Sequence, residues 1–136
     1  MASPSGRFHI VFNGEIYNFR VLSKELERRG HQFRGHSDTE VLAAAIEEWD
    51  IEETLVRTQG MFALAVWDKK GRELILCRDR MGEKPLFFAW LQKCFVFGSE
   101  LKALRSVFRQ ELKINRSALA SFFRFGYVPT PHCIYQ

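Results

Sequence analysis

The chain has 136 residues, of which 46% are hydrophobic and 26% charged, so it is long enough for one domain and typical of an ordered globular protein rather than a disordered one. Its 20 Lys and Arg residues exceed its 16 Asp and Glu residues by a formal charge of +4. This excess is spread thinly, with Arg28-Arg29 and Lys69-Lys70 as the adjacent basic pairs. A nucleic-acid-binding surface needs clustered basic residues, so we expect no nucleic-acid partner.

The cysteines, Cys77, Cys94 and Cys133, are odd in number and widely spaced. They predict neither a disulfide framework nor a CxxC metal pair, which favours a reducing compartment. No apolar run approaches the length that spans a bilayer, and the first residues, MASPSGR, lack the apolar region of a signal peptide. We therefore expect a cytoplasmic protein with no membrane partner.

The first predicted element is a strand over residues 8–12, where every second side chain is large and apolar. We expect this strand to stop at the Asn-Gly-Glu that follows it. A helix is predicted next, with Asn18 as its N-cap and Gly30 as the left-handed residue that ends it.

A second helix is predicted after Ser37-Asp-Thr-Glu40, which matches the capping box Ser-x-x-Glu and precedes apolar residues at helical spacing up to Trp49. From Gly60 the apolar period changes to two. This change predicts two β-hairpins, in which residues 61–68 pair with 73–80 and residues 85–90 pair with 94–100.

A last helix is predicted from Asn115 or Ser117 to Phe125, with Gly126 as its stop. The prolines beyond it, from Pro129 on, predict an extended tail. The order of strand, two helices and hairpins indicates helices packed on antiparallel sheet, which is an α+β fold.

Asn13 and Gly14 permit two interpretations, and from the dipeptide alone an ordinary turn is the better one. In a functional site, an Asn amide and a Gly backbone N–H side by side would stabilise a developing oxyanion, because glycine has no Cβ to block a substrate carbonyl. Glu15 and Asp38 together would bind a substrate ammonium. However, Asp38 also suits the positive end of its helix, and spacing alone favours that reading.

Other charged and titratable residues are interpreted as structural. The four histidines have no spacing that indicates zinc or a catalytic triad, and we expect no metal site. The stretch Arg78–Pro85, RDRMGEKP, is interpreted as a solvated hairpin end. It lacks the Walker-A pattern, so it does not predict a phosphate site.

Six segments resemble, in order, the glutaminase domain of glutamine-hydrolysing asparagine synthetases: FNGEIYNF, GHQF with HSDTE, GMFALAVWD, RDRMGEKPLFF, FGSELKAL and FGYVPTP. They cover nearly the whole chain. SDTE is shared by other class-II amidotransferases, whereas NGEIYN with RDR-x-G-x-KPL points to the asparagine synthetase type. The resemblance implies an N-terminal-nucleophile hydrolase fold, a four-layer αββα sandwich. It places a partial amidotransferase domain over residues 1–126 and the start of a linker to a synthetase domain over residues 127–136.

The resemblance also implies roles for the four candidate residues. Asn13 and Gly14 would form the oxyanion hole, and Glu15 and Asp38 would hold the amino-acid end of L-glutamine. The family's nucleophile is a cysteine at the mature N-terminus, activated by its own α-amine. Here the chain begins Met-Ala and its cysteines are internal. We therefore expect the nucleophile to be absent and the chain and its fold to be incomplete at the N-terminus.

These observations predict a partial glutaminase domain that is inactive and marginally stable as it stands. In the intact parent, glutamine hydrolysis would supply ammonia to a synthetase domain or subunit that uses ATP and Mg²⁺ to amidate aspartate, and the parent would be able to form a homodimer. We expect no cofactor in this chain itself. Two alternatives stay open: a non-catalytic module that binds glutamine or a synthetase subunit, and a nonfunctional gene remnant.

Overall fold

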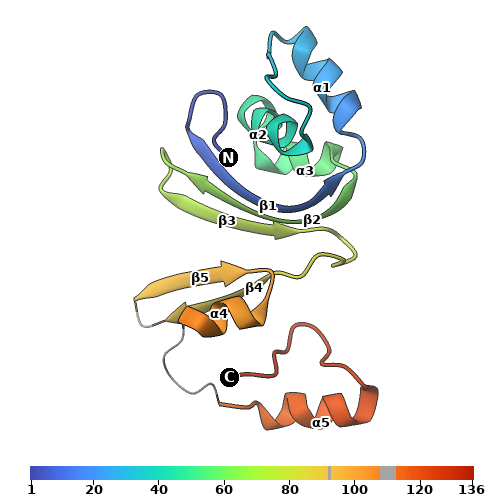
Figure 1. Ribbon diagram of the computed structural model, residues 1–136, viewed down its shortest axis with the longest axis vertical. Coiled ribbons are helices and arrows are strands. Elements are labelled where there is room, and N and C mark those ends of the chain that lie inside the picture. Colours follow the sequence, from blue (N-terminus) through green and yellow to red (C-terminus); the bar gives the residue numbers. More distant parts are fainter. Residues whose placement is uncertain (92, 108–112) are drawn as a thin grey trace. The chain divides into compact units, whose positions relative to one another are not determined.

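The computed structural model describes residues 1–91, 93–107 and 113–136 (Figure 1). They form two compact units, Met1–Phe87 and Phe88–Gln136. The first unit contains β1 (Phe8–Ile16), α1 (Phe19–Arg28), α2 (Asp38–Trp49), α3 (Ile51–Arg57), β2 (Gly60–Asp68) and β3 (Glu73–Arg78). At the boundary begins β4 (Phe87–Leu91), and the second unit continues with β5 (Cys94–Gly98), α4 (Leu101–Val107) and α5 (Arg116–Phe125). The mixture of helices and antiparallel sheet confirms the α+β class.

The first unit is built on a three-stranded antiparallel sheet in the order β1-β2-β3. The predicted hairpin of residues 61–80 is confirmed, because β2 pairs with β3 from Ala63 opposite Arg78 to Asp68 opposite Glu73. The prediction that the first strand stops at Asn13 is wrong. Strand β1 continues to Ile16, which lies opposite Gly60. Pairing with β2 along nine residues overrides the local turn preference of Asn-Gly.

Helices α1, α2 and α3 lie on one face of this sheet (Figure 1). Alternate residues of the strands point toward them, as the period of a strand requires. The buried core is contributed by strand residues Phe8, Ile10, Ile16, Phe62, Leu64 and Val66 and helix residues Leu22, Leu26, Leu42 and Ile46, with further α2 side chains. Each of these large side chains stabilises the fold by about 1.5–3 kcal/mol when fully buried. The second face of the sheet carries the side chains in between.

Helices α1 and α2 start where the sequence predicts, but the hydrogen bonds that cap them differ in part from those predicted. Ser37 caps α2 as predicted, because its Oγ accepts a hydrogen bond from the Glu40 N–H at 3.1 Å. The reciprocal half of the capping box is not formed, since the Glu40 carboxylate accepts from the N–H groups of Arg34 and Gly35 at 2.8 and 2.9 Å. At α1, Asn18 occupies the N-cap position without a side-chain cap bond. The predicted stop is confirmed, with Gly30 at a φ of +97°.

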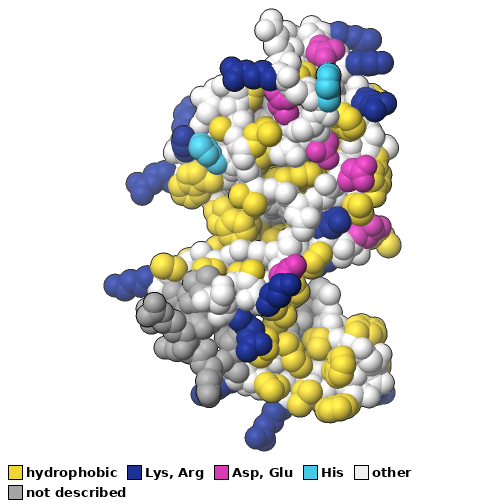
Figure 2. All heavy atoms as spheres, viewed as in Figure 1, with side chains coloured by type: hydrophobic (Ala, Val, Ile, Leu, Met, Phe, Trp, Pro, Cys, Tyr) yellow, Lys and Arg dark blue, Asp and Glu magenta, His cyan; other side chains and the backbone are white. Residues whose placement is uncertain are grey.

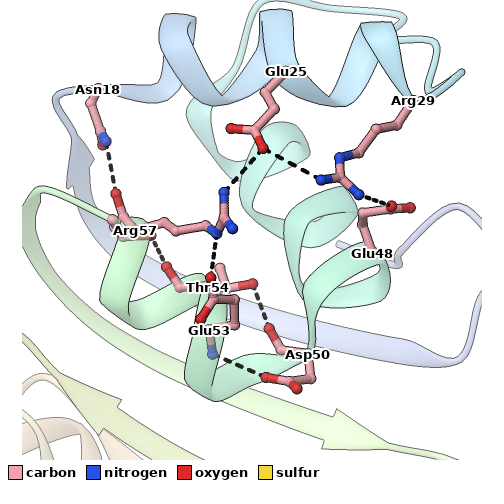
Figure 3. A network of polar contacts seen from close by, with 9 residues as sticks. Asn18, Glu25, Arg29, Glu48, Asp50, Glu53, Thr54 and Arg57 are labelled. Carbon is pink, nitrogen blue, oxygen red and sulfur yellow. Dashed lines mark hydrogen bonds and ion pairs between the residues drawn. The ribbon is translucent and has the colours of Figure 1, made fainter.

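The three helices are tied together by a polar network (Figure 3). The Arg57 guanidinium at the end of α3 binds Glu25 of α1 at 3.0 Å and Glu53 of its own helix at 2.7 Å. Arg29 joins α1 to Glu48 of α2 at 3.1 Å. Exposed pairs of this kind contribute little stability individually, so burial of the apolar core accounts for most of the stability of this layer.

The second unit has a hairpin with a helix beside it. Strands β4 and β5 pair as predicted, and α4, which the sequence did not indicate, contacts β5. Helix α5 begins after Asn115, whose side chain accepts from the next N–H groups, and ends at Gly126 with φ +80°. The stop at Gly126 was predicted, and of the two predicted starts, Asn115 and Ser117, the structure has the first. The tail is not simply extended, because Gln136 donates to the Lys113 carbonyl at 2.9 Å and returns to the start of α5.

The surface charges are mixed. On the face drawn in Figure 2, Lys and Arg side chains lie singly or in small groups among Asp and Glu. Within residues 1–91, 93–107 and 113–136, no helix has both the length and the apolar character needed to cross a bilayer.

Candidate functional site at the edge of β1

The candidate site lies along the edge of β1 that faces away from β2. The N–H groups of a strand in an antiparallel pair alternate between the two edges. Tyr17 N–H, just beyond β1, bonds to the Gln59 carbonyl on the β2 side at 2.8 Å. The even-numbered N–H groups point the other way, as those of Ile10 and Ile16 show by bonding to Met1 O at 2.8 Å and Asp38 Oδ2 at 3.0 Å. The Gly14 N–H therefore points out from this same edge.

Gly14 is required here for a reason that a turn does not explain. It lies opposite Phe62 in the register of β1 and β2. A Cβ on Gly14 would lie 2.6 Å from the Phe62 Cα and would also meet the Met61 carbonyl oxygen, and real Cβ atoms essentially never come that close to backbone. The two backbones thus approach closely at the point where the oxyanion hole is predicted, and the turn interpretation of Asn13-Gly14 is wrong.

Asn13 and Glu15 flank Gly14 and are both exposed. Since side chains alternate across a strand, both point to the face of the sheet opposite the helices. Asn13 pairs with Ala63 and Glu15 with Met61 in the β1–β2 register. Two of the predicted polar groups therefore lie on one face, on either side of the Gly14 N–H.

Asp38 reaches the same place from another element. It is the first residue of α2, where the Ser37 cap and the helix dipole favour a carboxylate. One oxygen, Oδ2, accepts from the Ile16 N–H at 3.0 Å, and Oδ1 accepts from Thr39 Oγ1 at 3.3 Å. Asp38 thus binds the end of β1 directly, at Ile16, the residue that follows Glu15. Asn13, Gly14 and Glu15 lie near the end of β1, and Asp38 reaches this strand end through its bond to the Ile16 N–H.

The N-terminal segment covers the other part of this edge. Met1 donates its ammonium to the Ile10 carbonyl at 2.8 Å, and the Phe8 N–H bonds to Ser3 Oγ at 3.2 Å. Ser3 in turn donates to Glu47 of α2. The stretch of β1 that includes Gly14 therefore lies between the N-terminal segment on one side and Asp38 on the other.

Two hollows lie close to α2 without including the candidate residues. One, of about 470 Å³, is lined by the N-terminal segment, residues 32–34, Glu40 and Ala44. The other, of about 490 Å³, lies between α1 and residues 33–41. Neither is lined by Asn13, Gly14 or Asp38, so these two hollows are separate from the candidate residues.

One residue was missed by sequence reasoning. The stretch RDRMGEKP is not simply a solvated hairpin end, because Asp79 is only 7% exposed. Its carboxylate accepts from the N–H groups of Phe62, Glu83 and Lys84 at 3.2, 2.9 and 3.0 Å. Burial alone would raise the pKa of Asp79, but these N–H donors lower it to about 2. The only sequence signal was an Asp within a dense run of charges.

None of the three cysteines belongs to β1 or α2. Cys77 of β3 packs against the core, and burial raises the pKa of its thiol, which makes it a weaker nucleophile at neutral pH. Cys94 is exposed and Cys133 half-buried, both in the second unit. Within the part of the chain that the structure describes, no three His, Cys, Asp or Glu side chains come together as a metal site.

Comparisons with known proteins show similarity along nearly the whole chain. The family described as "Glutamine amidotransferase domain" matches residues 1–136. Asparagine synthetase [glutamine-hydrolyzing] 3 of Bacillus subtilis (strain 168) is 43% identical over 124 residues, which are 91% of this chain and 20% of that protein. The putative asparagine synthetase [glutamine-hydrolyzing] 2 of Methanocaldococcus jannaschii is 35% identical over 130 residues, 93% of this chain and 24% of that protein.

A solved structure extends the similarity to the fold. Glutamine phosphoribosylpyrophosphate amidotransferase from B. subtilis superimposes with a TM-score of 0.69 at 28% identity, covering 79% of this chain and 25% of that one. The chain thus spans about a fifth to a quarter of the length of these relatives.

Proposed function

Because this chain belongs to the family of glutamine amidotransferase domains, with an α+β fold of the N-terminal-nucleophile hydrolase type, we propose that the edge of β1 binds L-glutamine. The observation that carries the proposal is the bond from the Ile16 N–H to Asp38. It brings a carboxylate from α2 to the strand end that carries Asn13, Gly14 and Glu15.

In this proposal the two halves of glutamine meet different residues. The Gly14 N–H and the Asn13 amide receive the side-chain carbonyl oxygen and stabilise the negative charge that develops on it during attack. Glu15 and Asp38 receive the α-ammonium, because an anionic pair favours a bound cation. The edge therefore orients the amide carbon for a nucleophile.

The nucleophile in such a reaction is a cysteine activated by its own α-amine, which forms a glutamyl thioester and releases ammonia. Cys77, Cys94 and Cys133 are all internal and cannot act in this way. We propose that this domain belongs to a glutamine-hydrolysing parent protein. That parent would use ammonia, ATP and Mg²⁺ in a separate synthetase domain, in the cytoplasm, to amidate aspartate.

A glutamine titration followed by ¹H–¹⁵N NMR tests the binding proposal. We expect saturable shifts of the Asn13, Gly14 and Ile16 amides, and in D38N a roughly tenfold weaker affinity, because Asn keeps an acceptor for the Ile16 N–H but loses the charge. E52Q is the matched control, since Glu52 is an exposed acidic residue in the first turn of α3. Equal affinities of D38N and the wild type would remove Asp38 from the site.

The same geometry also suits a second function, in which the domain binds a ligand without hydrolysing it. A non-catalytic module would bind glutamine, or a synthetase subunit, and remain bound. An assay of glutamate formation separates the two functions, because turnover that scales with the amount of purified protein would exclude the non-catalytic one. Absence of binding in the titration would leave the nonfunctional remnant.

A further inference from the structure

The Asp79 carboxylate is an unexpected buried anion in the loop that follows β3. Three backbone N–H groups converge on it, from Phe62 of β2 and from Glu83 and Lys84 of the loop. The Asp79 N–H also donates to the Phe62 carbonyl oxygen at 2.8 Å. Asp79 therefore holds both polar backbone groups of Phe62, which is a more rigid attachment than one hydrogen bond provides.

Phe62 is the residue that faces Gly14. The two are partners in the β1–β2 register, and a Cβ on Gly14 would lie only 2.6 Å from the Phe62 Cα and 2.8 Å from its Cβ. At such a close approach, a shift of Phe62 has to be followed by a shift of Gly14. The position of the Gly14 N–H is thus set through Phe62 by the residue that holds Phe62.

The loop has its own means of staying in place. Gly82 has a φ of +67°, which favours glycine, and its carbonyl accepts from the Arg78 guanidinium. The Gly82 N–H donates to the Asp79 carbonyl oxygen at 3.0 Å. These bonds place the Glu83 and Lys84 N–H groups against the Asp79 carboxylate. Backbone N–H donors stabilise its negative charge, so the carboxylate is ionised at neutral pH.

From this chain of contacts we propose that Asp79 is a positioning residue for the glutamine-binding edge: it fastens Phe62 and thereby aims the Gly14 N–H at the substrate carbonyl. Asp79 makes no contact with the substrate in this role. The inference rests on the proposed function, since the edge has to bind glutamine for the positioning to matter. Groups that support a binding site in this way are needed because small displacements cost much affinity or rate.

The test compares D79N with a matched control at another buried carboxylate. D68N alters a second carboxylate, equally buried at 7% exposed, at the far end of β2, where Asp68 faces Phe8 and accepts from Lys70 and Arg7. Both variants are expected to lower stability. We expect D79N alone to move the Gly14 amide resonance and to weaken glutamine binding by about tenfold, while D68N leaves both unchanged.

The outcomes separate the two proposals. A folded D79N with the Gly14 resonance and the glutamine affinity of the wild type would overturn the positioning role, and so would equal changes in D79N and D68N. If the wild type binds no glutamine, the proposed function fails, but the comparison of the Gly14 resonance still decides whether Asp79 positions it.

A second variant covers the case in which D79N does not fold. G82A strains the loop, because its φ is left-handed and its Cβ would lie 2.5 Å from the Arg78 Nη2, yet it leaves the sheet residues unchanged. It is expected to move the Gly14 resonance in the same direction as D79N, by less. Loss of the fold in both variants, with D68N still folded, would overturn the positioning role in favour of a purely structural one.

Discussion

Gly14 and Phe62 face each other across β1 and β2 at a distance that leaves no room for a side chain on Gly14, because its Cβ would lie 2.6 Å from the Phe62 Cα. A glycine in the middle of a strand is normally unfavourable by about 0.5–1 kcal/mol relative to alanine. At position 14 glycine is instead more favourable than alanine, because the backbone of Met61 and Phe62 occupies the space that a Cβ would need.

The first prediction is that Gly14→Ala destabilises the protein by about 3 kcal/mol or more, since the obstacle is backbone that cannot rotate away. Gly30→Ala is the control. Gly30 has a φ of +97° with no atom within 4 Å of an added Cβ, so only the conformational strain of about 1–2 kcal/mol is expected. Urea unfolding of both variants measures the difference, and equal losses would show that Gly14 is not sterically constrained.

The second prediction concerns the bond between α2 and β1. Asp38→Ala removes the acceptor of the Ile16 N–H and is expected to lower the free energy of unfolding by about 1–3 kcal/mol. Asp38→Asn keeps an acceptor oxygen and should lose less. Glu52→Ala, at an exposed site in the first turn of α3, should stay within about 0.5 kcal/mol. If alanine and asparagine at position 38 destabilise equally, the hydrogen bond to Ile16 contributes nothing measurable.

The third prediction concerns acid. The pKa of Asp79 is lowered from 3.8 to about 2 in the folded protein; the Arg7 side chain, which bonds to Asp68, likewise holds the pKa of Asp68 far below its usual value. At a pH between the folded-state pKa and the ordinary pKa of each Asp, the unfolded chain binds more protons than the folded one. The free energy of unfolding therefore falls as the pH drops through this range. We expect the free energy of unfolding to be fully retained above about pH 4–5 and to decrease from there toward pH 2.

Asp79→Asn tests the acid prediction. The difference in stability between the wild type and this variant should be largest near pH 6 and should shrink as the pH approaches 2, where the native carboxylate is also protonated. Chemical unfolding at several pH values, followed by far-ultraviolet circular dichroism, measures it. A difference that does not change with pH would mean that Asp79 contributes through packing alone.

The helix positions show what sequence patterns can predict. Gly30 and Gly126 marked the ends of α1 and α5, periodic apolar residues located α2, and the Ser37 cap is formed as expected. The reciprocal bond of the capping box, from the Ser37 N–H to Glu40, is not formed. The Glu40 carboxylate instead accepts from N–H groups of the preceding loop. Capping chemistry depends on where the incoming chain runs, and local sequence does not specify that path.

The short helix α3 was also not predicted. It has seven residues, and its N-cap Asp50 has a φ of 71°, which is unusual for a residue other than glycine. Arg57 of α3 forms an ion pair with Glu25, 32 positions earlier in the chain, because α1 lies beside α3 in the fold. A helix of this length gains most of its stability from such tertiary contacts, which leave little trace in the local pattern.

The sequence by itself determined the α+β class, most of the elements, and the residues of the candidate site, Asn13, Gly14, Glu15 and Asp38, because apolar periodicity and family motifs are local properties. Only the tertiary structure decided that Asn13-Gly14 is strand rather than turn, that Asp38 binds the Ile16 N–H, and that Asp79 is buried behind Phe62. Each of these depends on backbone groups far apart in the chain, and a hydrogen bond between them exists only once the sheet and helices have packed.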